Sequence, residues 1–130
     1  MANYSIKYHK LAIYGANIIV VHHTKNNFYD VLNKVCDKYG LNPEMYDDLH
    51  LCHGLSYEYY TAEKGQYFYL FVNTDYKKEY FDTFLHECYH LIRNLKKHFN
   101  LHEDDNCDNE QIAYLCGYLP NLLINKKLIK

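Results

Sequence analysis

The part of the sequence that most constrains the fold is a pair of strand-like runs followed by a long helical pattern. The runs LSYEYYTAE (55–63) and QYFYLFVN (66–73) are rich in aromatic and β-branched residues and are separated by the turn signal Glu63-Lys64-Gly65, which is typical of a β-hairpin. Apolar residues then recur every three or four positions from Tyr80 to Leu95, which predicts an amphipathic helix. We expect Thr74 or Asp75 to cap this helix.

Further elements are expected on both sides of this unit. Two strands are predicted near the N-terminus, YSIKYHK (4–10) and NIIVVHH (17–23). A helix that stops at Gly40, NNFYDVLNKVCDKYG (26–40), and a short helix, PEMYDDLHL (43–51), are predicted to follow them. After the motif helix we expect a second long helix, CDNEQIAYLCGYL (107–119), and a weakly supported terminal helix, LINKKLIK (123–130). In the second long helix, Asp108 and Gln111 can form a capping box and Pro120 ends or kinks the helix. These elements together predict an α+β fold with a small, mostly antiparallel sheet.

Length and composition indicate one domain that spans residues 1–130. The chain has 48% hydrophobic and 23% charged residues and a formal net charge of -2, so it has the composition of a globular protein and no basic surface for nucleic acid. The run LAIYGANIIVV (11–21) is interrupted by Asn17 and is too short to span a membrane, and no cleavage site follows it. The five cysteines form no CxxC pair, which indicates reduced thiols and a cytoplasmic protein.

The sequence His86-Glu87-Cys88-Tyr89-His90 is an H-E-x-x-H motif within the predicted helix. Residues four apart share a helix face, so His86 and His90 can bind one zinc ion. Glu87, about 100° around the helix, can instead reach a water molecule on that ion. The motif therefore contains the residue types that hydrolysis of an amide requires.

A catalytic zinc ion normally has a third protein ligand. Glu110 is the favoured candidate because it starts the second long helix, and Ala113 and Gly117, which would share its side of that helix, would allow the two helices to approach closely. Other carboxylates and imidazoles nearby in the sequence remain alternatives: Asp104, Asp105, Asp108, His98 and His102. Of these, Asp108 is the main competitor.

H-E-x-x-H followed about twenty residues later by N-E-x-x-A on another helix resembles the gluzincin branch of the zincin metallopeptidases. The likeness covers roughly residues 54–120 and extends to small predicted peptidases encoded by bacteriophages, in which case the protein would act in the host cytoplasm. The resemblance implies a minimal zincin-like domain, with a sheet packed on an active-site helix and a following glutamate-bearing helix. It also implies that His86, His90 and Glu110 bind zinc, that Glu87 is the general base, and that QYFYLFVN is an edge strand that holds a protein or peptide substrate.

The chain departs from the larger enzymes of this family in two places. Tyr114 lies where the thermolysin-like enzymes have an aspartate that orients a histidine ligand, and no separate C-terminal domain is expected to complete a cleft. Because no second domain is expected to form the far wall, we expect a shallow site or one that a protein partner completes. Tyr114 is the favoured donor for the oxyanion of the reaction, with His98 and His102 as alternatives.

The rival hypothesis is a non-catalytic protein of zincin fold that binds a partner and holds zinc structurally or not at all. Glu87 argues against it, because a purely structural site does not use a base beside its ligand. A second group, His50, Cys52 and His53, contains ligand-type residues without a familiar zinc spacing, and packing or turn roles are expected for it.

Overall fold

The computed structural model describes residues 3–11, 15–45, 47–98 and 110–125, and it confirms the α+β fold. The chain forms four strands and three α-helices in these ranges, which are β1 (Ser5–Leu11), β2 (Ala16–His23), α1 (Phe28–Tyr39), β3 (Gly54–Thr61), β4 (Gly65–Asn73), α2 (Tyr80–His98) and α3 (Glu110–Leu123). The predicted hairpin is β3–β4, and the predicted motif helix is α2. The predicted third-ligand residue, Glu110, begins α3.

The strands form one sheet in the order β1-β2-β4-β3. The β1–β2 and β3–β4 pairs are antiparallel, whereas β2 and β4 run parallel, so the sheet is mostly antiparallel as predicted. The expectation that QYFYLFVN is an edge strand is wrong, because β4 pairs with β2 on one side and β3 on the other. Every residue of β4 from Phe68 to Asn73 is buried, as a nearly continuous apolar run requires when both faces of a strand are covered. The edge beside α2 is β3.

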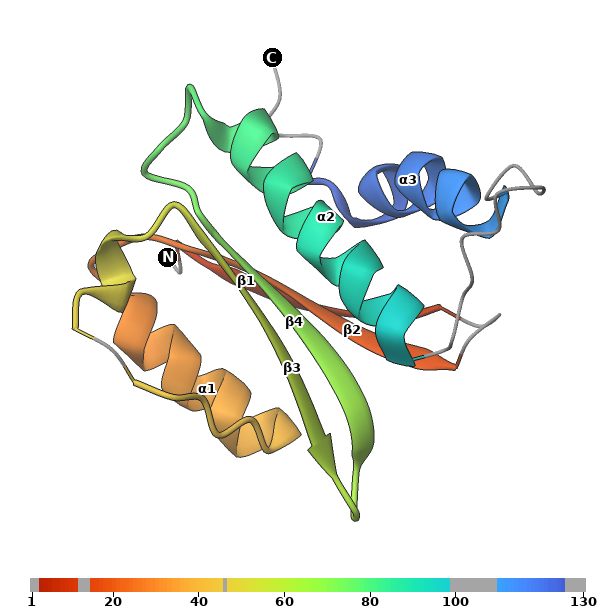
Figure 1. Ribbon diagram of the computed structural model, residues 1–130. Coiled ribbons are helices and arrows are strands. Elements are labelled where there is room, and N and C mark those ends of the chain that lie inside the picture. Colours follow the sequence, from red (N-terminus) through yellow and green to blue (C-terminus); the bar gives the residue numbers. More distant parts are fainter. Residues whose placement is uncertain (1–2, 12–14, 46, 99–109, 126–130) are drawn as a thin grey trace.

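Helices cover both faces of the sheet (Figure 1). Alternate residues of the central strands point to opposite faces. Ile18 and Val20 pack with α2 and α3, whereas Ile19 and Val21 pack with α1. The strand β4 repeats this division, since Phe68 joins the first cluster and its neighbour Tyr69 the second. The molecule is therefore a three-layer arrangement in which α2, with the motif, lies over β4 and β3.

The stop signal after the first helix is confirmed. Gly40 adopts a left-handed conformation (φ 80°) and its backbone N–H donates to the carbonyl oxygen of Cys36, which is the geometry that glycine favours at a helix C-terminus. The predicted short helix over residues 43–51 is wrong. Within the described part of that segment only Leu49–Leu51 forms a single 3-10 turn, where Leu49 is buried against the α1 layer. This segment is therefore held by the packing of Leu49 and not by the hydrogen bonds of a regular helix.

Two local expectations for the later helices differ from the structure. Thr74 and Asp75 do not cap α2, because the Thr74 hydroxyl donates to the His23 carbonyl oxygen and an Asp75 carboxylate oxygen accepts from the Lys25 N–H. Pro120 does not end α3, which continues to Leu123. The predicted capping residue Asp108 and most of the predicted terminal helix lie outside the described residues. Both side-chain bonds of Thr74 and Asp75 tie the chain after β4 to the end of β2 instead.

None of the described helices is long and apolar enough to span a lipid bilayer. The four cysteines within the described ranges, Cys36, Cys52, Cys88 and Cys116, carry free thiols. Cys88 packs in the core, whereas Cys116 is exposed on α3.

His22 gives the fold a predictable dependence on pH. Burial, followed by repulsion from Lys7 and His23, lowers the pKa of His22 to about 4, compared with about 6.5 in an unfolded chain. Between these pH values the unfolded chain binds a proton that the folded chain does not, so the free energy of unfolding falls as the pH falls through this window, by up to about 1.4 kcal/mol per pH unit. Urea unfolding at about pH 7 and about pH 5 measures this loss.

The His22→Gln variant is the comparison for this prediction. A glutamine can still meet the Tyr80 hydroxyl, which lies 2.9 Å from Nε2 of His22, but it cannot take up a proton. We expect the variant to lose less stability than the natural chain over the same pH interval. Equal losses in the two proteins would show that His22 is not responsible.

Candidate active site

The site lies where α2 crosses the edge strand β3. Alternate residues of β3 (Gly54–Thr61) face opposite layers of the molecule. Ser56 and Glu58 face α2, because Ser56 contacts Glu87 and Glu58 contacts His98. Leu55 and Tyr57, by contrast, pack with the α1 layer. The side of β3 beneath α2 therefore presents small and polar side chains instead of an apolar surface.

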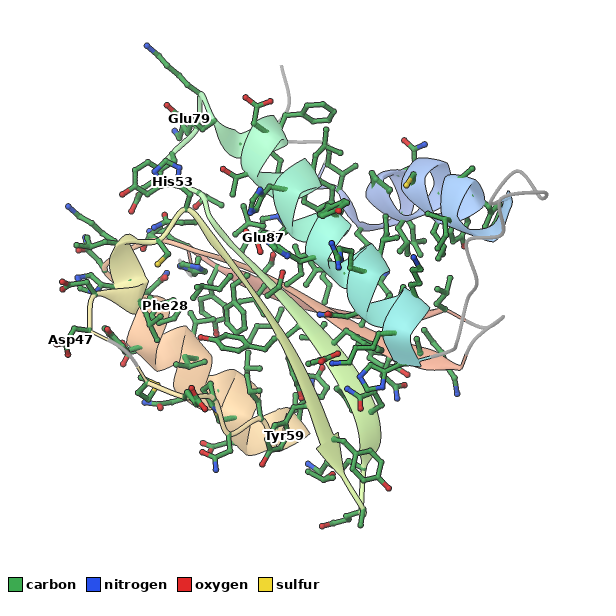
Figure 2. All side chains as sticks on the ribbon, in the orientation of Figure 1. Phe28, Asp47, His53, Tyr59, Glu79 and Glu87 are labelled. Carbon is green, nitrogen blue, oxygen red and sulfur yellow. The ribbon has the colours of Figure 1, made fainter. Side chains whose placement is uncertain are left out.

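Glu87 is buried between α2 and β3, as Figure 2 shows. It is only 5% exposed, and one carboxylate oxygen, Oε1, accepts a 2.6 Å hydrogen bond from the Ser56 hydroxyl. A hydrogen bond of this length to a carboxylate is one of the stronger kind. No described residue donates a hydrogen bond to the second oxygen, Oε2, which is open to solvent because it is not among the described buried atoms that lack a partner. The carboxyl group is thus held in one orientation through one oxygen while the other remains available.

Gly54 allows α2 to approach β3 this closely. A Cβ atom at this position would lie 2.8 Å from Cγ and from Oε2 of Glu87, and 2.9 Å from the methyl group of Thr83. Such distances are shorter than carbon atoms tolerate without displacement. The space above the Gly54 α-carbon is therefore occupied by the Glu87 side chain itself.

The two histidines of the motif lie on the exposed side of α2 and converge. Their Nε2 atoms are 3.1 Å apart and their rings meet edge to face. Two nitrogen ligands of a tetrahedral zinc ion, each at about 2.0–2.1 Å, are about 3.3–3.4 Å apart. The pair is therefore spaced within a few tenths of an ångström of what two ligands of one zinc ion require, and the donor type suits that ion.

Cys88, the central residue of the motif, has no role as a nucleophile. Burial, together with the nearby Glu87 charge, raises the pKa of its thiol to about 12, so the reactive thiolate is absent at neutral pH. Its side chain packs with Phe84 and Leu91 in the core beneath α2. The chemistry of the motif is thus confined to His86, Glu87 and His90.

An open hollow of about 520 Å³ adjoins these residues. The hollow is lined by residues at the start of β3 and by residues at and just before the first two turns of α2. The first group is Cys52, His53 and Gly54, and the second is Glu79, Asp82, Thr83, His86 and Glu87. His53 stacks on Tyr76 with ring centroids 3.7 Å apart, and the Tyr76 hydroxyl donates to the Leu51 carbonyl oxygen. His53, one of the lining residues, is therefore held in place by Tyr76, and Glu87 borders the same hollow.

The described residues bring two of the three predicted zinc ligands together. Glu110 begins α3, but its side chain lies outside the described residues, as do Asp104, Asp105, Asp108 and His102. Among the side chains that the structure does describe, no three histidine, cysteine, aspartate or glutamate residues are grouped to hold a metal ion. His98, another alternative, instead contacts a Glu58 carboxylate oxygen at 2.8 Å. The third ligand therefore remains a prediction.

The packing of α3 differs from the expectation. Leu115, Leu119 and Leu123 are buried against α2 and the sheet, whereas Ala113 and Gly117 are exposed. The reason is that leucines four residues apart bury far more apolar area than alanine and glycine do. In Figure 1, α3 lies on the side of α2 away from β3, and its N-terminal end is farther from α2 than its C-terminal end. No described contact joins that end to the histidine pair.

Tyr114, the predicted oxyanion donor, is exposed on α3 and stacks on Tyr118 with ring centroids 5.1 Å apart. It is not among the residues that line the hollow beside His86. In the second group of ligand-type residues, His53 and Cys52 do line the hollow, whereas His50 lies beside Tyr29. Proximity to the motif thus favours His53 over Tyr114 as a side chain that a bound substrate would meet.

Gly54 and Ser56 are the site residues that sequence reasoning missed. A glycine at the start of an aromatic strand is itself a sign of close backbone approach. Ser56 and Glu58 alternate with Leu55, Tyr57 and Tyr59, so the strand has one small polar face. These signals predict that another segment of the chain packs closely on that face of the strand, but they do not identify Glu87 as the residue that does so.

Replacing Ser56 with alanine is expected to lower the free energy of unfolding by about 1.5–3 kcal/mol, because the hydrogen bond to the Glu87 carboxylate is lost inside a buried contact. Ser56→Thr, which retains the hydroxyl, is the matched control and should lose less. Urea unfolding measures both variants. Equal stability of Ser56→Ala and the natural chain would show that the bond contributes nothing.

The assignment of this site rests on the residues and their geometry. The chain matches no family model, no curated protein and no solved structure.

Proposed function

We propose that the protein is a zinc-dependent metallopeptidase that hydrolyses peptide bonds in a protein or peptide substrate. The observation that carries the proposal is the convergence of His86 and His90, with Nε2 atoms 3.1 Å apart, directly beside the buried carboxylate of Glu87. An ordinary exposed helix face does not require either feature. The spacing suits two zinc ligands, and the oriented carboxylate suits a base.

Each side chain has a distinct role in this proposal. His86 and His90 would hold the zinc ion, and Glu110 is the proposed third ligand. A zinc ion bound there would lower the pKa of a coordinated water molecule towards about 7 and polarise the substrate carbonyl group. Glu87 accepts the proton of the attacking water through Oε2 and later donates it to the leaving amine. Ser56 holds Oε1, so that the free oxygen keeps one orientation.

The substrate backbone is proposed to lie along β3. This strand is an edge of the sheet and contacts α2, so one row of its main-chain groups can pair with an extended peptide. The role that the family resemblance assigns to QYFYLFVN thus passes to the strand beside it. A peptide added there would run past Gly54 and Glu87.

The test is cleavage of a denatured-protein mixture by the purified protein with zinc, with zinc removed by a chelator, and with zinc restored. The proposal expects cleavage that disappears with the metal and returns with it. Digestion products are identified by mass spectrometry. Absence of cleavage with zinc bound would instead support the alternative function.

The alternative is a partner-binding protein of the same fold without catalysis. One observation favours it: Ala113 and Gly117, which were expected to let α3 approach α2 closely, are exposed instead. Without a metal ion, a 3.1 Å separation of the Nε2 atoms allows a hydrogen bond in which one imidazole donates and the other accepts. A protein partner that completes the site would reconcile the two functions.

The identity of the third ligand makes a separate prediction. Glu110→Ala should reduce the zinc content of the purified protein more than Asp108→Ala does, because a catalytic zinc site has only three protein ligands and loses most of its affinity when one of them is removed. Metal analysis of the two variants, side by side, measures the difference. The opposite ranking would transfer the role to Asp108.

A further inference from the structure

We infer that His53 is a catalytic residue of the proposed reaction, and that its imidazole donates a hydrogen bond to the carbonyl oxygen of the scissile peptide bond as that oxygen gains negative charge. The inference rests on the proposed function, because hydrolysis of an amide needs a donor of this kind. Neither of the other described candidates is placed for the role. Tyr114 does not line the hollow beside His86, and His98 contacts Glu58.

The first observation is the position of His53. It lies at the end of the sheet beside the start of α2 (Figure 2), and it lines the same hollow as His86 and Glu87. The next residue, Gly54, touches the proposed base, since a Cβ added there would lie 2.8 Å from Oε2 of Glu87. Consecutive α-carbons are about 3.8 Å apart. The backbone of His53 is therefore one residue away from the contact with the base.

The second observation is that the ring of His53 can meet a ligand. The side chain is exposed, and neither ring nitrogen forms a hydrogen bond with a described residue. A neutral imidazole has one N–H donor and a protonated imidazole has two. A donor is therefore present in either protonation state, and a group bound in the hollow can accept from it.

The third observation is that the ring has one orientation. It stacks on Tyr76 with ring centroids 3.7 Å apart and an angle of 23° between the ring planes. Tyr76 is itself fixed, because its hydroxyl group donates to the Leu51 carbonyl oxygen. A donor that is oriented before the reaction stabilises a developing charge without the cost of reorganisation.

The fourth observation is that a buried asparagine fixes the backbone of the same loop. Asn73, at the end of β4, is 1% exposed. Its backbone N–H donates to the His53 carbonyl oxygen at 2.8 Å, and its side-chain amide donates to the carbonyl oxygens of His50 and Cys52. The residues on both sides of Leu51 are therefore attached to the centre of the sheet, and His53 is presented from a rigid part of the fold.

The first experiment measures zinc-dependent cleavage by His53→Phe, in which a ring can still stack on Tyr76 but no donor remains. We expect kcat to fall by about 10²–10³-fold, the effect of removing one donor to an oxyanion. KM should change little, and the zinc content should be retained. His53→Gln, whose side-chain amide can donate, should lose less.

The matched control is His50→Phe. His50 belongs to the same loop but lies beside Tyr29 and does not line the hollow next to His86. The chemical change is the same, so His50→Phe should cleave at close to the natural rate.

The second experiment does not depend on cleavage. The probe is acetyl-hexaalanine amide in which a phosphinate group replaces the central peptide bond, so that the probe carries a tetrahedral anion. Isothermal titration measures its binding to the zinc-loaded natural chain and to His53→Phe. We expect His53→Phe to bind it about 10²-fold more weakly, because the affinity for such an analogue follows the stabilisation of the transition state. The unmodified hexapeptide, measured with Glu87→Gln added to both chains, should bind equally to both.

Four results would overturn the inference. They are an unchanged kcat of His53→Phe, a rise in KM alone, a loss of zinc from this variant, and a phosphinate affinity that is equal in the two chains or absent from the natural chain. Any of these with cleavage by the natural chain would refute only the role of His53. A phosphinate affinity that depends on His53 in a chain that cleaves nothing would support the donor as inferred and contradict the proposed hydrolysis.

Discussion

Glu87→Gln is expected to lower the kcat for zinc-dependent peptide cleavage by about 10²–10⁴-fold, the contribution that a positioned general base makes. The fold should be unaffected, because the amide oxygen of glutamine can accept the hydrogen bond that Ser56 donates to Oε1. The zinc content should also be retained, since neither histidine is changed. Initial rates with a quenched fluorescent peptide mixture, at saturating zinc, measure the loss.

The matched control for this variant is Glu58→Gln, which removes a carboxylate from the same strand that carries Ser56. Glu58 contacts His98 and Lys97 near the surface, and a partly exposed pair of this kind contributes about 0–1 kcal/mol to stability. We expect Glu58→Gln to cleave at close to the natural rate. A Glu87→Gln protein that binds zinc and cleaves as fast as Glu58→Gln would remove Glu87 from the mechanism.

Gly54→Ala is expected to reduce cleavage by about 10²-fold, since a displacement of about 1 Å at a catalytic group has an effect of this size. The added Cβ would lie 2.8 Å from Cγ of Glu87, so α2 or the carboxylate must move away from β3. Overpacking of this kind also destabilises proteins by about 1–3 kcal/mol. Cleavage rates and urea unfolding of the same preparation measure both effects.

Gly117→Ala provides the control, because it is the same chemical change where a Cβ meets no atom within 4 Å. Gly117 lies within α3, so alanine should stabilise the helix by about 0.5–1 kcal/mol. Cleavage should remain at the natural level. If Gly54→Ala behaved like Gly117→Ala in both assays, the close contact between α2 and β3 would not control the position of Glu87.

Local patterns in the sequence predicted most of the elements of the fold. The hairpin was predicted because strand-forming residues flank a glycine at Gly65, which adopts φ 85°, and α1 because apolar residues recur every three or four positions before Gly40. These signals act over a few residues. The pairing of β4 with β2 depends instead on contacts between residues about fifty positions apart, such as Ile19 with Tyr69, and the local pattern of β4 does not reveal its neighbours.

The candidate site shows the same division between local and distant information. The convergence of His86 and His90 follows from helix geometry alone, because residues four apart share a face. The contact of Glu87 with Ser56 joins residues that are thirty-one positions apart, so it required the tertiary structure. The helix caps expected at Thr74 and Asp75 failed for a related reason, since bonds to the end of β2 compete for the same side chains.

The central claim is that the two exposed imidazoles of α2 hold a divalent metal ion, and its most direct test is the zinc content of the purified chain after dialysis against dilute zinc. The account predicts about one zinc ion per chain in the natural protein and in His98→Ala, a histidine on the same helix outside the pair, and a large loss in His86→Ala and in His90→Ala. Equal zinc content in all four proteins, or none in the natural chain, would contradict it.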